Sequence, residues 1–383
     1  MKTLFKILIV FSSVILLFIA YVAIPHTYSP DGALSKEIVK THSYIADSQS
    51  FSAIDNNRPT SINRFYGGSD QRELDGRIWY PTIANGDIAE GAFPLIVYSH
   101  GFMSMHIEAT YLAEFLAQRG YIVLAVDYPL SNTFAPGGPR AEDVINQPAD
   151  VSFLIDTMLN RNKDNNDLFS GHIDPDRIAV AGLSLGGMTT ALVAFHPQMR
   201  DPRIKAAVSI AGPTIMFDET FFATSDMPFM YVAGDIDAMV YYDSNALPIL
   251  EKNPGSILMT ISGASHSGFV THSENLFRML DNADSVGCQA IVRFIPEIED
   301  GQEFIPGLGG KEQGILSTSF DKSQMPCQQM PLPSAIRPGL QHVFTQLAVY
   351  SFFDSHFSKD DSSRQKSSTY LTQTLAKENS LVN

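Results

Sequence analysis

Short apolar runs alternate with amphipathic segments through the middle of the chain. The runs contain few polar side chains, which is typical of parallel strands that are buried on both faces of a sheet. They are Pro94–Ser99, Tyr121–Val126, Ile178–Ala181, Ile204–Ile210, Phe229–Ala233 and Ile257–Ile261. Apolar residues at helical spacing lie between them, most clearly in Ile107–Arg119 and Val151–Met158. This alternation predicts an α/β fold whose mostly parallel sheet carries helices on both faces.

The segments outside this alternation predict additions to the same domain. Arg77–Pro81, with the sequence RIWYP, indicates an early strand that ends at the proline. A helical stripe in Leu340–Phe352 predicts the final core helix, and Tyr370–Lys377 predicts one more short helix before a frayed end. The stretch before the final helix is rich in proline and glycine and predicts an irregular insertion, and the pattern leaves open whether it covers an active site. The predicted boundaries are 64–281 for the core, 282–334 for the insertion and 335–383 for the C-terminal helices and tail.

The N-terminus carries a long apolar segment. Ile7–Ile24 contains no charged residue and follows Lys2 and Lys6. Such a run is long enough to cross a bilayer and also fits the core of a signal peptide. We favour a retained anchor, because Tyr21 weakens the small-x-small signal that would precede cleavage after Ala23.

The charges around this segment predict its orientation. The two lysines favour a short N-terminus that stays in the cytoplasm, with the bulk of the chain exported and anchored. The alternative is secretion after a signal peptide is cleaved. The anchor or signal, residues 1–24, leads into residues 25–63, a polar stretch that we interpret as a tether with one short helix around Ser35–Tyr44.

Composition narrows the classes of function. The chain has 383 residues, of which 44% are hydrophobic and 17% are charged, as expected for a globular protein with a substantial core. The formal net charge is −15, which argues against nucleic acid as a partner because phosphate contacts require a basic surface. The sequence contains neither His-Glu-x-x-His nor Cys-x-x-Cys, so it predicts no metal site and no cofactor. It does not indicate an oligomeric state.

The candidate chemistry centres on the segment Gly182–Gly186, which reads Gly-Leu-Ser-Leu-Gly. It follows a predicted strand and precedes a helical segment rich in alanine, leucine and methionine. A strand, a sharp turn and a helix in this order form a nucleophile elbow, which exposes the hydroxyl of Ser184 at the end of the strand. Glycine is required on both sides because a side chain at 182 or 186 would strike the neighbouring strand or helix.

This segment resembles the centre of an α/β-hydrolase. The stretch from Arg77 to Asp354 is similar to the serine esterase and lipase branches that include dienelactone-hydrolase-like and platelet-activating-factor-acetylhydrolase-like proteins, apart from the insertion. In this fold the acid and the histidine follow the serine in loops at the carboxyl ends of later strands. The resemblance therefore implies a triad of Ser184, Asp237 and His266, because the last two end loops of the form Gly-x-x-Asp and Gly-x-x-His.

Two neighbouring residues compete for these roles. Asp235 lies on the same loop as Asp237, and the spacing from Gly234 favours Asp237, which leaves Asp235 as a residue that caps the loop or is solvated. His272 lies six residues after His266, where a following helix should begin. His266 stands at the exit of the strand and is the better candidate for the base.

A serine hydrolase also needs backbone N–H groups that bind the oxyanion. The resemblance implies Leu185, directly after the nucleophile, and Phe102 in the loop after Pro94–Ser99, with Met103 as the second choice. We interpret His100 in the same loop as structural. The side chains of Phe102, Met103, Leu185 and Met188 suit an acyl chain or an aromatic ester, and they equally suit a plain core.

The only two cysteines, Cys288 and Cys327, both lie in the insertion. An exported domain occupies a compartment in which disulfides persist, and the insertion has few regular hydrogen bonds to stabilise it. The sequence therefore predicts a Cys288–Cys327 disulfide, with two buried thiols as the alternative.

These features predict a serine esterase that forms an acyl-enzyme on Ser184, which water then hydrolyses. Two alternatives stay open: a lipase or phospholipase-A2-like acylhydrolase that acts on membrane lipids, and a tethered hydrolase-fold protein that binds a ligand or partner without turnover. The predicted partners are a small-molecule or lipid ester and, through the N-terminal segment, a membrane.

Overall fold

The computed structural model describes residues 11, 21, 26–294, 303, 305–316 and 324–383. The predicted membrane segment falls almost entirely outside these residues, and so do parts of the insertion. Within the described part of the chain, no helix combines the length and the apolar character that crossing a bilayer requires.

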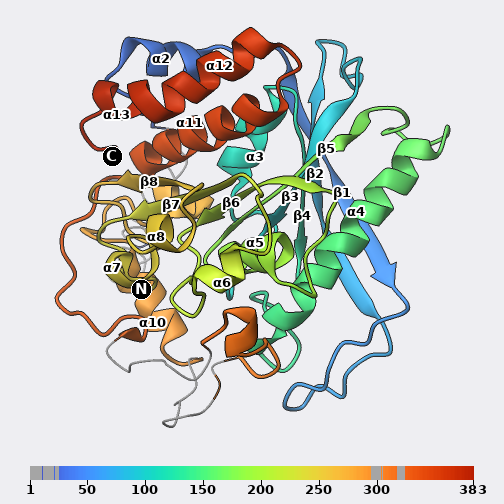
Figure 1. Cartoon of the computed structure of the whole chain (residues 1–383), viewed down its shortest axis with the longest axis vertical. Helices are drawn as coiled ribbons and strands as arrows, with labels where there is room; N and C mark the ends of the chain where they lie inside the picture. Colours follow the sequence, from blue (N-terminus) through green and yellow to red (C-terminus); the bar gives the residue numbers. More distant parts are fainter. Residues whose placement is uncertain (1–10, 12–20, 22–25, 295–302, 304, 317–323) are drawn as a thin grey trace, which may run out of the picture.

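An eight-stranded sheet runs through the centre of the molecule (Figure 1). The strand order is β1-β2-β4-β3-β5-β6-β7-β8, with β1 and β2 antiparallel to their neighbours and β3 to β8 mutually parallel. The strands are β1 (Ile45–Asp55), β2 (Arg72–Thr82), β3 (Phe93–Ser99), β4 (Ile122–Asp127), β5 (Ile173–Leu183), β6 (Ile204–Ile210), β7 (Phe229–Gly234) and β8 (Ile257–Ile261). This arrangement confirms the predicted fold class. Because the parallel strands end at one edge of the sheet, the loops that follow them meet there.

Helices cover both faces of the sheet (Figure 1). One face packs against α4 (Gln147–Lys163) and α5 (Leu185–Phe195), and the other against α3 (Thr110–Ala117) and α11 (Pro338–Phe357). The remaining α-helices are α2 (Ala33–Lys40), α6 (Glu219–Phe222), α7 (Tyr242–Asn245), α8 (Ile249–Lys252), α9 (Thr271–Leu276), α10 (Asp284–Ile291), α12 (Asp361–Thr369) and α13 (Leu375–Glu378). The apolar side chains between these layers form the core, as the hydrophobic pattern predicts.

The stretch predicted to be a tether contains a complete edge strand, which corrects that interpretation. The predicted short helix is present as α2, but β1 pairs with β2 along its whole length, from Ile45 opposite Thr82 to Asp55 opposite Arg72. An edge strand keeps polar residues on its exposed face. Its composition therefore resembles that of a linker.

The predicted end of the early strand is also wrong. Pro81 lies inside β2, opposite Ala46 of β1. The pairing between β4 and β2 extends only from Asp75 to Trp79, so at Pro81 no second named strand lies beside β2, and the carbonyl of Pro81 accepts a hydrogen bond of 3.0 Å from Ala89 of the following turn instead. A proline is tolerated at such a position because the missing N–H faces no second strand.

The C-terminus is ordered, although the sequence predicts a frayed end. The helical segment predicted near Tyr370 continues from α12 and leads into α13. Asn383 then exchanges backbone hydrogen bonds of 2.8 and 3.0 Å with Thr260, and Val382 forms a β-bridge with Ile261. The last residues thus cover part of the exposed edge of β8.

Candidate active site

Ser184 occupies a strained turn between β5 and α5. Its backbone has φ 57° and ψ −121°, a combination that a non-glycine residue adopts only when its surroundings enforce it. The surroundings are tight, because a Cβ on Gly182 would overlap the backbone of Gly186, and a Cβ on Gly186 would overlap the carbonyl of Ser99. The side chain of Ser184 is half-buried at the carboxyl edge of the sheet. This is the geometry of a nucleophile elbow.

The structure brings Asp237 and His266 together, as predicted. Asp237 follows β7, His266 follows β8, and the Oδ2 of Asp237 lies 2.6 Å from the Nδ1 of His266. The other carboxylate oxygen of Asp237 accepts hydrogen bonds from the N–H groups of Met239 and Val240, at 2.8 and 2.7 Å. Both catalytic candidates are buried, with 4% and 5% of their surface exposed, so the hydrogen bond between them is protected from water.

The electrostatics of this pair suit a general base. Burial lowers the pKa of His266, but the carboxylates of Asp237, Asp284 and Glu108, with Asp237 the largest contributor, together outweigh this effect and hold the pKa above its ordinary value. The hydrogen bond to Asp237 engages Nδ1. Within the described residues Nε2 makes no hydrogen bond, so this nitrogen is available to accept a proton.

The competing residues have other surroundings. The Oδ1 of Asp235 accepts a hydrogen bond of 2.6 Å from the N–H of Gly263, which ties the loop after β7 to the loop after β8. His272 is exposed at the beginning of α9. Neither side chain bonds to the Asp237–His266 pair.

The loop after β3 offers one free backbone donor close to Ser184. The N–H of Met103 donates to the carbonyl of Ser131 at 2.9 Å, so it is occupied, whereas the N–H of Phe102 has no acceptor among the described residues. This difference favours Phe102 over Met103 as the oxyanion donor in this loop. Leu185, the other predicted donor, is the first residue of α5. Its N–H therefore belongs to the helix turn that has no acceptor within the helix.

The apolar residues assigned to this region divide into two groups. Met188 and Leu185 are buried in the main core, with 1% and 6% exposure, which is the plain structural role. Phe102 and Met103 are half-buried beside the nucleophile turn. His100 is fully buried, and its Nε2 accepts a hydrogen bond of 3.0 Å from the N–H of Tyr128.

Asp284 is a functional candidate that the sequence reasoning missed. It is the first residue of α10, in the insertion, and is fully buried. Its carboxylate accepts hydrogen bonds from the N–H groups of Ala238, His266 and Ser267, at 3.1, 3.1 and 2.6 Å. It therefore connects the loop after β7, which carries Asp237 (the acid loop), to the loop after β8, which carries His266 (the histidine loop). A carboxylate that binds only backbone groups leaves no motif in the sequence.

The predicted disulfide is present in the same region. The sulfur atoms of Cys288 and Cys327 are 2.03 Å apart, and the bond connects α10 to the later part of the insertion. The N–H of Cys327 donates to the carbonyl of Ala238 at 2.7 Å, next to Asp237. Both ends of this disulfide-closed segment thus contact the acid loop.

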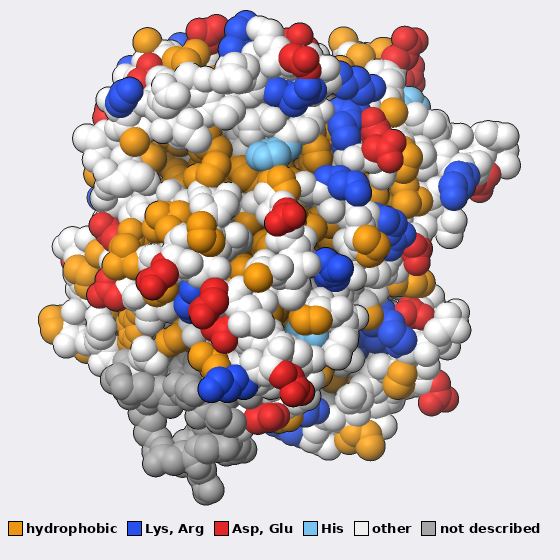
Figure 2. Space-filling view, viewed as in Figure 1, with side chains coloured by type: hydrophobic (Ala, Val, Ile, Leu, Met, Phe, Trp, Pro, Cys, Tyr) orange, Lys and Arg blue, Asp and Glu red, His pale blue; other side chains and the backbone are white. Residues whose placement is uncertain are grey.

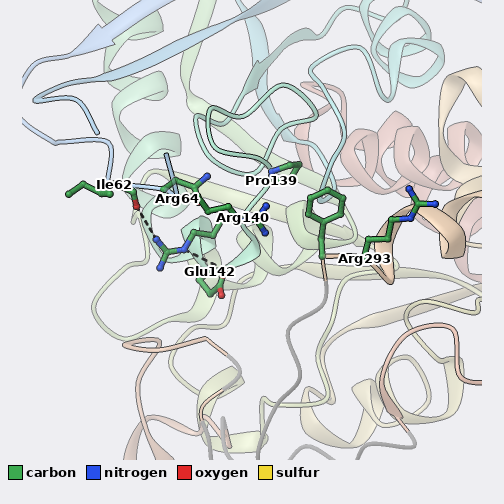
Figure 3. Close-up of a pocket in the computed structure, with 8 residues that line it drawn as sticks. Ile62, Arg64, Pro139, Arg140, Glu142 and Arg293 are labelled. Carbon is green, nitrogen blue, oxygen red and sulfur yellow. Dashed lines mark hydrogen bonds and ion pairs between the residues drawn. The ribbon is translucent and has the colours of Figure 1, made fainter. Parts of the chain in front are cut away.

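A shallow pocket of about 390 Å³ lies beside the loop that follows β4 (Figure 3). Arg64 and Arg140 both line this pocket: the guanidinium of Arg140 lies against the carbonyl of Ile62 and the carboxylate of Glu142, and the side chain of Arg293 extends away from them. The side-chain amide of Asn63 donates to the carbonyls of Pro136 and Gly138, which holds the two walls together. On the face that Figure 2 shows, acidic and basic side chains are interspersed, so the net charge of −15 forms no single acidic field there.

Comparison with known proteins agrees with this geometry. A family model described as PET hydrolase-like matches residues 41–300. The chain is 32% identical over 163 residues to Hydrolase LUC6 of Fusarium sp, a match that covers 42% of this chain and 35% of the relative. It is 24% identical over 194 residues to Cutinase est1 of Thermobifida alba, covering 50% and 57% of the two chains.

A further relative is the bis(hydroxyethyl) terephthalate hydrolase of Streptomyces coelicolor, which is 24% identical over 194 residues and covers 50% of this chain and 54% of the relative. The matches thus span about a third to little more than half of the length of these relatives. The family model, by contrast, covers more than half of this chain and coincides with the sheet and the loops described above. The chain therefore belongs to the PET hydrolase-like family of the α/β-hydrolase superfamily.

Proposed function

We propose that this enzyme cleaves carboxylic esters through an acyl-enzyme on Ser184, with His266 as the general base and Asp237 as its orienting carboxylate. The observation that carries the proposal is the buried hydrogen bond of 2.6 Å between Asp237 and His266, at the sheet edge where Ser184 is strained and half-exposed. A serine hydroxyl needs such a base to act as a nucleophile, and the base needs an orienting carboxylate.

The reaction follows from this arrangement. The Oγ of Ser184 attacks the ester carbonyl while its proton moves to the Nε2 of His266, and the N–H groups of Leu185 and Phe102 stabilise the oxyanion. Collapse of the tetrahedral intermediate breaks the ester bond, and the leaving alcohol takes the proton from His266. Water, deprotonated by the same histidine, then attacks the acyl-enzyme and releases the acid. The Asp237 carboxylate stabilises the imidazolium in both steps.

The half-buried side chains of Phe102 and Met103 beside the oxyanion loop support an ester with a short acyl chain or an aromatic acid. Two relatives are named as a cutinase and as a terephthalate ester hydrolase. Bis(hydroxyethyl) terephthalate is therefore the first aromatic substrate to test here.

An acylhydrolase that acts on membrane lipid is the second candidate. Phe134 is 76% exposed, and its neighbour Thr133 donates a hydrogen bond to the carbonyl of Met103 in the oxyanion loop. Phe65 and Ile62, which are 87% and 68% exposed, flank Asn63, whose amide donates to the carbonyl of Pro136 in the same loop as Phe134. Exposed apolar side chains that cluster at a rim are typical of surfaces that contact a lipid phase. The N-terminal segment, if it anchors the enzyme as the sequence predicts, would keep the enzyme at a bilayer.

The substitution Ser184→Ala tests the mechanism. It should abolish hydrolysis of p-nitrophenyl esters and labelling by a fluorophosphonate without unfolding the protein, because it removes the nucleophile and little volume. The expected loss in turnover is about 10⁶-fold, as for another serine hydrolase. A variant that keeps labelling or turnover would refute the assignment.

Two matched pairs test the rest of the triad. His266→Ala and Asp237→Asn should lower turnover by orders of magnitude. His272→Ala and Asp235→Asn should stay within about tenfold of the wild type, because His272 is exposed and an asparagine still accepts the hydrogen bond from Gly263. The reverse ranking within either pair would overturn that half of the triad. A series of p-nitrophenyl esters with acyl chains of increasing length, alongside bis(hydroxyethyl) terephthalate, separates the esterase from the lipase.

A further inference from the structure

A second buried carboxylate lies beside the catalytic groups, and the proposed reaction does not use it. Glu108, just before α3, is 2% exposed. Its Oε1 and Oε2 lie 3.1 and 3.0 Å from the backbone nitrogen of Gly101, and Oε1 also accepts a hydrogen bond of 3.0 Å from the hydroxyl of Tyr98. Removing a carboxylate from water costs free energy, so a buried carboxylate needs hydrogen-bond partners that offset this cost.

Gly101 is the point of contact between Glu108 and the nucleophile. A Cβ on Gly101 would lie 3.1 Å from the Oε2 of Glu108 and 3.2 Å from the Cβ of Ser184. The carboxylate and the nucleophile therefore flank the same glycine. The backbone carbonyl of Glu108 also accepts a hydrogen bond of 2.7 Å from the N–H of Thr271, so the residue is tied to the segment that follows His266.

The carboxylate controls one of two consecutive peptide groups in the oxyanion loop. Glu108 holds the N–H of Gly101. The carbonyl of Gly101 belongs to the next peptide group, whose N–H is that of Phe102, and this carbonyl lies 2.7 Å from the Nδ1 of His100. Because the Nε2 of His100 accepts a hydrogen bond from Tyr128, Nδ1 carries the proton and donates it to Gly101. The N–H of Ser104 also donates to the carbonyl of Gly101, at 3.1 Å. Glycine has the widest backbone freedom of any residue, and these contacts together fix its two peptide groups.

We propose that Glu108 is a positioning residue of the oxyanion hole. By holding the N–H of Gly101, its carboxylate sets the direction of the peptide group that presents the N–H of Phe102 to the oxyanion. This inference rests on the proposed function, because it concerns the donor that the proposed reaction requires.

The charge of Glu108 provides a second and separable effect. Burial raises the pKa of Glu108 to about 7, although the hydrogen bonds from Ser104, Gly101 and Tyr98 lower it. Glu108 is therefore ionised in the alkaline range, in which a histidine base is neutral. The charged groups that face His266 are the carboxylates of Asp237, Asp284 and Glu108, and each raises the pKa of His266. Removing the charge at position 108 should therefore lower the pKa of the catalytic base.

The transition state explains why the charge alone does not set the rate. Proton transfer creates an oxyanion on the substrate and an imidazolium on His266 at the same time. A carboxylate at Glu108 destabilises the first charge and stabilises the second, so the two effects on the barrier partly cancel. We therefore expect kcat to depend mainly on the hydrogen bond between Glu108 and the N–H of Gly101, and less on the charge of Glu108.

Three substitutions test the proposal. Glu108→Gln keeps an acceptor for Gly101 and loses the charge, Glu108→Leu loses both, and Glu114→Gln changes an exposed glutamate of α3 as a control. At pH 9, Glu108→Gln should keep kcat within about threefold of the wild type. Glu108→Leu should lose about 10- to 100-fold in kcat with KM little changed, which is less than the loss from deleting an oxyanion donor outright. Glu114→Gln should behave as the wild type.

Two further readouts separate positioning from a merely structural role. Affinity for phenylboronic acid, which forms a tetrahedral adduct on the serine, should fall in Glu108→Leu in parallel with kcat. In Glu108→Gln the acid limb of the kcat/KM profile should move to lower pH by about 0.5 unit, which is less than the shift that a contacting charge produces. Because the glutamine variant keeps the hydrogen bond, it remains informative if the leucine variant does not fold.

The outcomes distinguish this inference from the proposed function. If Ser184→Ala keeps its activity, the proposed function fails. If Ser184→Ala is inactive while both Glu108 variants keep the wild-type kcat, boronate affinity and acid limb, the role of Glu108 is overturned and the triad stands. A loss of activity in Glu108→Gln as large as in Glu108→Leu, with no shift of the acid limb, would also refute the proposal, since that variant retains the acceptor.

Discussion

Breaking the disulfide should lower the stability of the whole hydrolase domain more than it lowers activity. The bond joins Cys288 of α10 to Cys327, which are separated by 39 residues in the sequence. A cross-link of this span restricts the unfolded chain by about 4 kcal/mol in the loop-closure model. We therefore expect Cys288→Ala with Cys327→Ala to lose about that amount of unfolding free energy in an oxidising buffer.

The size of this loss depends on whether the insertion unfolds together with the sheet. Two contacts couple them: the carboxylate of Asp284 accepts N–H groups from both catalytic loops, and the N–H of Cys327 donates to the carbonyl of Ala238. Activity should remain within about tenfold at low temperature. The reason is that Asp237 is held by two N–H groups of its own loop, which do not depend on the disulfide.

The single tryptophan makes the assay specific. Trp79 is 2% exposed in β2, close to the edge of the sheet opposite to β7 and β8, so its fluorescence reports unfolding of the sheet. Urea titration of the wild type and the double variant should show the midpoint of the Trp79 transition moving to lower urea. The same shift should appear in the wild type after reduction. An unchanged Trp79 midpoint would show that the insertion unfolds on its own, and the coupling argument would fail.

Two further predictions concern the base and the buried ion pairs. Because the carboxylates of Asp237, Asp284 and Glu108 together hold the pKa of His266 above its ordinary value, kcat/KM should fall as the pH decreases through a value above 6.5, and a flat profile from pH 8 to pH 5 would exclude a histidine base. Arg72 is fully buried between Asp143 and Asp150, at 3.0 and 2.6 Å, so Arg72→Met should cost about 3 to 5 kcal/mol of unfolding free energy in urea titration. Arg161→Met, which removes a half-exposed ion pair, is the control and should cost under about 1 kcal/mol; equal losses would contradict the prediction.

The sequence was sufficient for the apolar strands of the fold and insufficient for its polar edge strand. Strands that contain little besides apolar residues stand out in the hydrophobic pattern, so β6 and β8 begin and end where this pattern places them, although β8 lies at one edge of the sheet. β1 could not be found in this way, because it lies at the edge of the sheet and only its pairing with β2 makes it a strand. Pro81 misleads for the same reason: whether a proline ends a strand depends on how many neighbours the strand has at that residue.

In the candidate site, too, sequence motifs predict some residues, whereas others can be assigned only from their contacts in the folded structure. Ser184, Asp237 and His266 stand at strand ends in recognisable loops, and the structure places the last two in contact. The choice between Phe102 and Met103 required the partner of each N–H, which only the folded loop reveals. The resemblance to the α/β-hydrolases favours Phe102 and makes Met103 the second choice, without giving the reason.

The insertion is the clearest case in which sequence reasoning undervalued a segment. Its lack of periodicity leaves open whether it covers the active site or lies far from it. In the structure, Asp284 at its beginning accepts hydrogen bonds from the backbone of both catalytic loops, and the N–H of Cys327 near its end donates to the acid loop. Such contacts join a carboxylate or a peptide N–H to backbone atoms, and backbone atoms are the same in every residue. These contacts therefore cannot be predicted from the pattern of side chains in the sequence. We conclude that the insertion is part of the scaffold that fixes Asp237 and His266, and that changes within it should be judged first by their effect on that hydrogen bond.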